Sequence, residues 1–171
     1  LYERAREVGS SGRIEDTLAL FTQKIREFVP FETCAIYLVD ESGRYADVIH
    51  AEGENLELLL AKRIRIGEGA TGIALKKQET VVNVNPDLDF SVSQIELAQE
   101  YSTMASLPLL SGGQLIGAVS IYSRELTQYA DEHIRLLETV SRIAADAIGK
   151  SKQHDEAKVH ALTDPMTGLP N

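Results

Sequence analysis

Apolar residues recur every three or four positions in two long stretches of the chain, and this spacing predicts two amphipathic helices. The first stretch covers residues 13–29 and stops at Pro30, which cannot continue a helix. Its apolar positions are Ile14, Leu18, Phe21, Ile25 and Phe28. The second stretch runs from about Asp131 to Leu162. Asp131 and Glu132 suit its first turn, because carboxylates stabilise the positive end of the helix dipole.

Between these helices, short runs of β-branched and aromatic residues bounded by turn residues predict strands. The expected strands cover residues 33–39, 45–51, 63–66, 80–84, 104–110 and 114–122. Short helices are expected at 56–61 and near 94–101, where Ser93 and Glu96 have the spacing of a capping box. Most strands neighbour their sequence partners. The fold class is therefore α+β, with an antiparallel sheet of five to six strands flanked by helices and a long C-terminal helix.

The composition suits one compact domain with flanking helices, since 43% of the 171 residues are hydrophobic. Seventeen basic against 26 acidic side chains give a net charge of -9, which argues against nucleic acid or an anionic membrane as a partner. The single cysteine, Cys34, sits in an apolar run and indicates a reducing compartment. Without a signal-peptide pattern or an apolar run of roughly 20 residues, we expect a cytoplasmic location and no membrane contact.

The order of these elements, the segment 66–74, and the apolar runs 107–109 and 115–121 together resemble a GAF domain. The resemblance covers about residues 14–149 and implies a PAS-related sensory fold whose pocket opens near the helix that follows the glycines. A small-molecule ligand is expected to contact Arg63, Arg65, Gly69, Ala70, Thr71, Gly72, Asp87, Phe90, Tyr101 and Ser106.

Gly67, Gly69 and Gly72 match the G-x-G-x-x-G pattern of dinucleotide-binding folds, but their context favours a structural role. Only residues 73–77 separate the last glycine from the next strand, which is too short for a crossover helix. We interpret the glycines as supplying positive φ and a close turn. The alternative is that free amides at residues 69–72 hold an anionic part of a ligand at a helix N-terminus.

Other chemistry associated with this family lacks its residues here. The polar cluster of Asn83, Asn85, Asp87, Asp89 and Phe90 has neither the Lys nor the adjacent Asp-Glu pair of cyclic-nucleotide-binding GAF domains, so we interpret it as a loop of Asx turns. Cys34 is followed by Ala35 and not by His, which argues against a covalent chromophore. A lone cysteine also cannot support methionine-sulfoxide reduction. No metal site is expected, because His50, His133, His154 and His160 have no paired spacing with other ligands.

The long C-terminal helix carries two adjacent seams. One consists of Leu136, Val140, Ile143, Ala147, Lys150, His154, Ala157 and Ala161, and the other of Ile134, Leu137, Ser141, Ala144 and Ile148. One seam can cover the domain itself, which leaves the other for a second copy. We therefore expect a parallel homodimer whose terminal helices pack together and continue as a short coiled coil. The alternative is a single helix packed on its own domain, with a frayed polar tail.

After this helix, Asp164, Pro165, Thr167, Gly168 and Leu169 resemble the opening motif of GGDEF domains, the catalytic units of diguanylate cyclases, with Met166 where Leu is usual. We expect an incoming helix and linker at 1–12, a GAF-like domain at 13–149, a signalling-helix linker at 150–162 and the start of a GGDEF domain at 163–171. The resemblance implies a non-catalytic sensory and dimerisation module of cyclic di-GMP signalling. A ligand-free structural spacer, or the input of a combined GGDEF and phosphodiesterase protein, are alternatives.

Overall fold

The computed structural model describes residues 10–90 and 100–162, with side chains for 14–90 and 100–151. The helices are α1 (Ser10–Phe28), α2 (Leu56–Leu60), α3 (Gly69–Lys77) and α5 (Asp131–Leu162), with a 3-10 helix, η2 (Pro86–Asp89). The strands are β1 (Thr33–Val39), β2 (Tyr45–Gly53), β3 (Arg63–Arg65), β4 (Val81–Val84), β5 (Thr103–Ser111) and β6 (Gln114–Ser123).

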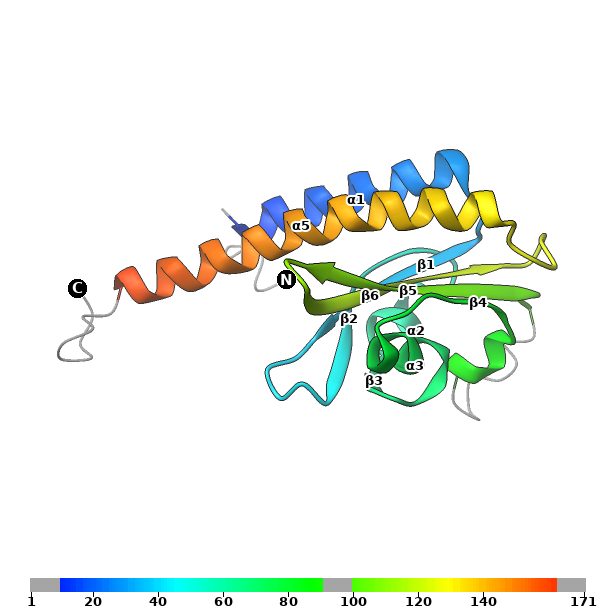
Figure 1. The fold of residues 1–171 in the computed structure, drawn as a ribbon, viewed down its shortest axis with the longest axis horizontal. Helices are drawn as coiled ribbons and strands as arrows, with labels where there is room; N and C mark the ends of the chain where they lie inside the picture. Colours follow the sequence, from blue (N-terminus) through cyan, green and yellow to red (C-terminus); the bar gives the residue numbers. More distant parts are fainter. Residues whose placement is uncertain (1–9, 91–99, 163–171) are drawn as a thin grey trace.

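The six strands form one antiparallel sheet in the order β3-β2-β1-β6-β5-β4, which confirms the predicted α+β class. The helices α1 and α5 run antiparallel to each other along one face of the sheet (Figure 1). The shorter helices α2, α3 and η2 cover the opposite face (Figure 1). The sheet is therefore the middle layer between a pair of long helices and a group of short ones.

The two predicted amphipathic helices bury their apolar faces against the sheet. The side chains of Leu18 and Ile25 on α1 and of Leu137 and Ile148 on α5 are each no more than 1% exposed. They pack with strand residues such as Ile121 in one continuous core. Burial of this apolar surface, at about 25 cal/mol per Å², supplies the main stabilisation of the helix layer.

Several expected boundaries differ from those observed. The helix α1 begins at Ser10 and not at residue 13, so Ser10, Ser11 and Gly12 are helical and not part of the linker expected at 1–12. Serine is well tolerated at a helix start, and one glycine there costs only about 1 kcal/mol. Phe28, expected in the core, is 55% exposed, because Val29 takes the buried position after it. The helix expected near 94–101 falls mainly on residues 91–99, which lie outside the described residues, and Tyr101 is not helical.

The start of α5 is attached to two other parts of the domain through Tyr129. The backbone amide of Tyr129 donates to Oδ1 of Asn83 on β4 at 2.6 Å, and Nδ2 of Asn83 donates back to the carbonyl of Tyr129 at 3.0 Å. The Tyr129 hydroxyl donates to the carbonyl of Pro30, just after α1, at 2.9 Å. The position at which α5 leaves the domain therefore depends on β4 and on the end of α1.

Candidate functional site

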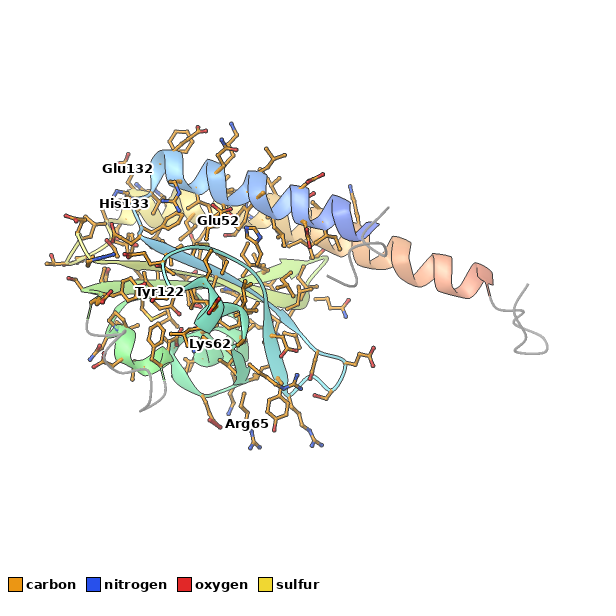
Figure 2. All side chains as sticks on the ribbon, turned by 180° about the vertical axis from the view of Figure 1, so that it is seen from behind. Glu52, Lys62, Arg65, Tyr122, Glu132 and His133 are labelled. Carbon is orange, nitrogen blue, oxygen red and sulfur yellow. The ribbon has the colours of Figure 1, made fainter. Side chains whose placement is uncertain are left out.

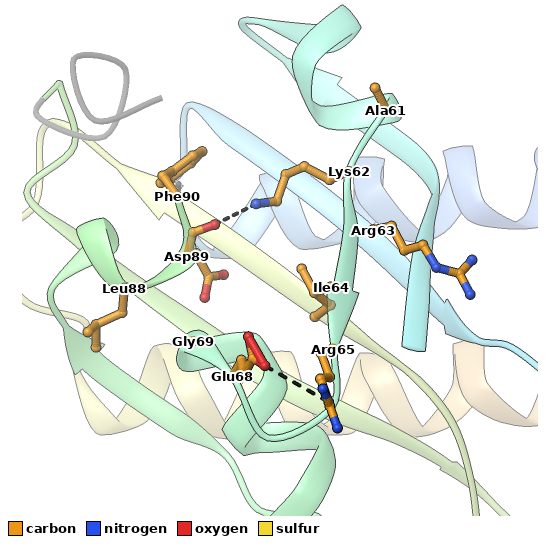
Figure 3. Close-up of a pocket in the computed structure, with 10 residues that line it drawn as sticks. All are labelled: Ala61, Lys62, Arg63, Ile64, Arg65, Glu68, Gly69, Leu88, Asp89 and Phe90. Carbon is orange, nitrogen blue, oxygen red and sulfur yellow. Dashed lines mark hydrogen bonds and ion pairs between the residues drawn. The ribbon is translucent and has the colours of Figure 1, made fainter. Parts of the chain in front are cut away.

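A pocket of about 410 Å³ opens between β3, the start of α3 and η2 (Figure 3). It is lined by Ala61, Lys62, Arg63, Ile64, Arg65, Glu68, Gly69, Leu88, Asp89 and Phe90. Its volume lies within the range of small-molecule sites, roughly 300 to 1,000 Å³. The lining combines apolar side chains with a few charged groups, as ligand pockets usually do.

Lys62 provides the charged group inside this pocket. Its Nζ donates to the backbone carbonyl of Asp89 at 2.5 Å and lies 5.0 Å from the centre of the Phe90 ring. Burial lowers the pKa of Lys62, and the negative charge of Asp89 partly opposes that effect. Figure 2 shows Lys62 within the domain, whereas Arg65 lies at its outer edge.

The two arginines of β3 face away from the pocket interior. The Arg63 side chain points away from the pocket (Figure 3). It donates to both carboxylate oxygens of Asp47 at 3.0 Å and to Asp40 at 2.5 Å. Arg65 is at the rim, where its Nε lies 4.0 Å from Oε2 of Glu68. Arg63 is therefore engaged within the protein, while Arg65 forms only a long, exposed ion pair.

The carboxylate of Asp89 is buried beneath the pocket and holds the start of α3. Oδ1 accepts the backbone N–H of Thr71 at 2.9 Å, and Oδ2 accepts the hydroxyls of Thr71 and Tyr122 at 2.5 and 2.7 Å. The side chain of Glu68, the N-cap residue of α3, makes no capping hydrogen bond. A carboxylate from η2 thus takes the place of a local cap.

This arrangement corrects one alternative from the sequence. That alternative needs a free amide at Thr71, but the carboxylate of Asp89 already accepts its hydrogen bond. The hydrogen bonds continue into the sheet, because Oγ of Ser120 lies 2.5 Å from Oγ1 of Thr71 and 2.8 Å from Oγ of Ser106. The helix start, η2 and the central strands are therefore joined by one buried polar network.

Of the residues expected to contact a ligand, the structure brings four to the pocket, namely Arg63, Arg65, Gly69 and Phe90. Thr71 and Ser106 belong to the buried network instead. Ala70 and Gly72 are buried within α3, and Asp87 is half-buried on η2 outside the lining. Tyr101 is buried, with its ring stacked 6.4 Å from Phe90 and its hydroxyl 2.7 Å from Oγ1 of Thr33.

The glycines have the structural role that we inferred. Gly69 has φ +74°, and a Cβ on it would lie 2.6 Å from the carbonyl oxygen of Leu88. A Cβ on Gly72 would lie 2.8 Å from the carbonyl oxygen of Arg65. These glycines allow α3 to start close to β3 and η2, and the antiparallel sheet excludes a dinucleotide-type βαβ unit.

The interpretation of the 83–90 segment as local Asx turns is right for one residue only. Oδ1 of Asn85 accepts the backbone N–H of Asp87 at 2.9 Å, which is an Asx turn. Asn83 and Asp89 instead bond to parts of the chain distant in sequence. Both are engaged by long-range contacts that local composition does not reveal.

Sequence reasoning missed Lys62, Asp89, Ser120 and Tyr122. For Lys62 a signal existed: side chains two apart on a strand share a face, and Lys62 precedes Ile64 by two residues. For the buried carboxylate no local pattern was available, because acidic loop residues are usually solvated.

Other candidate chemistry is not assembled in the part of the chain that the structure describes. No group of three or more His, Cys, Asp or Glu side chains comes together there. Cys34 is fully buried, and burial raises the pKa of its thiol far above the ordinary range, so the nucleophilic thiolate is disfavoured. Among the described helices, none is long and apolar enough to cross a membrane.

The seam of α5 that runs from Leu136 to Ala161 is only partly buried against the domain. On α5, Leu136, Val140 and Ala147 are half-buried, whereas Ile143 is 67% exposed. Lys150 is exposed, while the side chains of His154, Ala157 and Ala161 lie outside the described ones. The GGDEF-like motif residues Asp164, Pro165, Thr167, Gly168 and Leu169 also lie outside the described residues.

A central antiparallel sheet with a helix pair on one face and a pocket on the other defines the chain as a small α+β domain. The sequence profile of the GAF domain matches residues 12–149, and the chain belongs to this family of regulatory domains. Family membership supports the expectation that the chain itself is not an enzyme.

Solved structures share this fold. The GAF domain/HD domain protein from Geobacter sulfurreducens is 16% identical with a TM-score of 0.71, over 82% of this chain and 94% of that one. The GAF domain of a two-component sensor histidine kinase from Bacillus halodurans is 15% identical with a TM-score of 0.65, over 85% and 97%. Type II free methionine-R-sulfoxide reductase from Thermoplasma acidophilum is 15% identical with a TM-score of 0.62, over 80% and 92%. No curated protein matches the chain in sequence.

Proposed function

We propose that this GAF domain senses a small molecule in the pocket and transmits its binding to α5. One observation carries this proposal: the short segment 83–90 reaches both places. Asp89 and Phe90 line the pocket at one end of the segment. At the other end, Asn83 holds the backbone of Tyr129 just before α5.

The coupling follows from how this segment is held. A ligand can shift a conformational equilibrium only if it binds one state better than the other. A ligand in contact with Phe90 or the carbonyl of Asp89 can favour one position of η2, and β4 lies directly before η2. Any displacement of Asn83 then changes two hydrogen bonds at the start of α5.

The test uses ligand screening followed by hydrogen exchange. A set of cyclic nucleotides and common metabolites is screened by thermal shift, and amide exchange along α5 is measured with any compound that binds. Asn83→Ala should leave binding intact but abolish the exchange change in α5. If no compound binds, or if Asn83→Ala leaves the exchange response unchanged, the proposed transmission is wrong.

Asn55→Ala is the matched control. Asn55 has φ 59°, the same left-handed backbone as Asn83, and it makes no side-chain capping hydrogen bond. Both substitutions therefore impose similar backbone strain, whereas only one removes the contact with Tyr129. The control should keep the α5 response.

For the output, we propose a GGDEF domain that forms cyclic di-GMP. The support is the resemblance of residues 164–169 to the GGDEF opening motif, directly after a 32-residue helix. The natural coding sequence after Asn171 should encode a Gly-Gly-Asp/Glu-Glu-Phe loop, and the full natural protein should convert GTP to cyclic di-GMP. A continuation without that loop would exclude this output and leave the sensory role in place.

We also propose that the domain works as a homodimer through α1 and α5. An apolar groove of about 390 Å³ lies between the two helices, and the exposed fractions of Leu20 and Ile143 beside it are 61% and 67%. A second copy fits this groove because the antiparallel α1 and α5 form a two-helix layer (Figure 1). Two such layers can close into a four-helix bundle.

One observation favours the alternative of a structural spacer. The space next to the pocket is filled by the rings of Phe90, Tyr101 and Tyr122, whose centres are 5.4 to 6.4 Å apart. In this role the pocket would take no ligand, and the domain would only hold two chains in register. A screen in which no compound raises the melting temperature would favour the spacer.

A further inference from the structure

We propose that the pocket recognises a small organic anion, whose carboxylate or phosphate is bound by Lys62 and whose apolar part lies against Phe90. This inference rests on the proposed function in one respect, namely that the pocket is a ligand site. It adds the chemical class of the ligand, which follows from the charges that the protein leaves unmatched there.

Acidic groups outnumber basic ones in the chain as a whole, but they are not the groups that can contact a ligand in this pocket. The net charge is -9, yet three basic side chains occur at positions 62, 63 and 65. The Asp89 carboxylate already accepts three hydrogen bonds from Thr71 and Tyr122. Its oxygens are therefore occupied within the protein, and its negative charge acts on Lys62 only from beyond ion-pairing distance. The direct contact between the two residues is the bond from Lys62 to the backbone carbonyl of Asp89.

Comparing the charged partners of the three basic side chains leaves Lys62 as the cation inside the pocket. Arg63 is occupied outside it by Asp40 and Asp47. At the rim, Arg65 and Glu68 form a long pair, with side chains 63% and 70% exposed, so solvent screens both charges. A ligand in the pocket therefore meets one half-buried ammonium group, that of Lys62.

The Lys62 ammonium is incompletely satisfied. It has three N–H donors, of which one bonds to the carbonyl of Asp89. The face of the Phe90 ring lies nearby, and no carboxylate among the described residues is within ion-pairing distance of Nζ. Burial of a charge with few partners is unfavourable, so an incoming anion that takes the remaining donors is stabilised.

The rest of the pocket sets the shape of the ligand. Ile64, Leu88 and Phe90 provide apolar surface in the lining of the pocket. Phe90 is 8% exposed and its ring stacks on Tyr101, so it is held in place at the pocket wall. An anion with a compact aromatic or aliphatic body therefore fits better than a bare inorganic ion.

The experiment uses four probes with similar bodies and different charge: phenylacetate, phenyl phosphate, neutral phenylacetamide and cationic phenethylamine. Binding is followed by NMR of the protein labelled with ¹³C at the lysine side chains, which reports on Lys62 directly. We expect phenylacetate or phenyl phosphate to shift the Lys62 signal, and comparison of these two separates a carboxylate from a phosphate ligand. The neutral and cationic probes should bind at least about tenfold more weakly, since tenfold corresponds to one lost ionic contact of about 1.4 kcal/mol.

The variants locate the effect at one side chain. Lys62→Met keeps an unbranched apolar stem and removes the charge, so it should abolish the preference for anions, whereas Lys62→Arg should retain part of it. Lys77→Met, at the exposed end of α3, removes the same charge away from the pocket and should change nothing. Circular dichroism and the melting temperature verify that each variant is folded.

The outcomes separate this inference from the proposed function. If the neutral or cationic probe binds as tightly as the anions, or if Lys62→Met binds anions as well as the natural chain does, the anion class is wrong. The pocket then still stands as a sensor site. If no probe and no metabolite of any charge perturbs a pocket residue, both this inference and the proposed function are wrong.

Discussion

The carboxylate of Asp89 caps the start of α3 by accepting both the backbone N–H and the hydroxyl of Thr71, at 2.9 and 2.5 Å. The two residues are 18 positions apart, so this cap is a tertiary contact. It links the floor of the pocket to the sheet, because the Thr71 hydroxyl also contacts Ser120. The same carboxylate therefore stabilises α3 and fixes the position of η2.

Asp89→Asn should destabilise the domain while leaving its shape unchanged. The neutral amide side chain presents one acceptor oxygen where the carboxylate presents two, so all three donors lose a charged partner and at least one loses its acceptor. We expect the free energy of unfolding to fall by about 1–3 kcal/mol, measured by urea denaturation. Asp87→Asn, half-buried on the same 3-10 helix, is the control and should change it by less than about 0.5 kcal/mol. Equal effects of the two substitutions would contradict the role given to Asp89.

The buried tyrosines predict a loss of stability at high pH. Burial raises the pKa of Tyr37, Tyr122 and Tyr129 above the ordinary value, and nearby carboxylates add to it, Asp89 for the first two and Glu32 for the third. The neutral phenols keep their protons in the folded state, whereas the unfolded chain releases them at about pH 10. Stability is therefore complete below pH ~10 and is lost as the pH rises further, by up to about 1.4 kcal/mol per pH unit for each tyrosine.

Near-ultraviolet absorbance of tyrosinate checks this prediction. Three of the six tyrosines should ionise only when the domain unfolds, as followed in parallel by circular dichroism. Tyr122→Phe removes one of these groups and should make the alkaline transition less steep. Ionisation of all the tyrosines before any loss of secondary structure would show that these phenols are accessible.

The elements of the fold were predictable because their signals are local. The expected ends of the long helix, Asp131 and Leu162, are those of α5, since its apolar spacing and acidic first turn lie within the helix itself. Strands bounded by turn residues were also found, to within a few residues. The start of α1 was missed because the Ser and Gly residues before position 13 were assigned to a linker, although they are compatible with a helix N-terminus.

The site was only partly predictable because its contacts join distant residues. Arg63 was expected to bind a ligand, but its guanidinium forms ion pairs with Asp40 and Asp47 of the neighbouring hairpin. Nothing near Asp89 in the sequence indicates that it is buried against Tyr122, 33 residues away. The sequence shows which charged side chains a strand carries, but only tertiary packing decides which of them remain without an ion-pair partner.

The thiol of Cys34 should be unreactive in the folded protein. It is fully buried in the central strand β1, and burial raises the pKa of the thiol, so both access and the thiolate form are limiting. A thiol-specific disulfide reagent should label the native domain only at the rate at which it opens, and should label the denatured chain at once. Rapid labelling of the native protein would show that β1 is exposed in solution.

The groove between α1 and α5 predicts how the dimer is disrupted. Ile143→Glu replaces an apolar side chain that is 67% exposed in the single chain with a charged one. Burial of an unpaired charge in an interface is strongly unfavourable. We expect sedimentation equilibrium to give the dimer mass for the natural chain and the monomer mass for Ile143→Glu, with an unchanged circular dichroism spectrum. Leu58→Glu is the control: Leu58 is 46% exposed on α2, on the opposite face of the sheet, and its substitution should leave the dimer intact. A natural chain that remains monomeric at high concentration, or a dimer that survives Ile143→Glu, would show that the groove is not the interface.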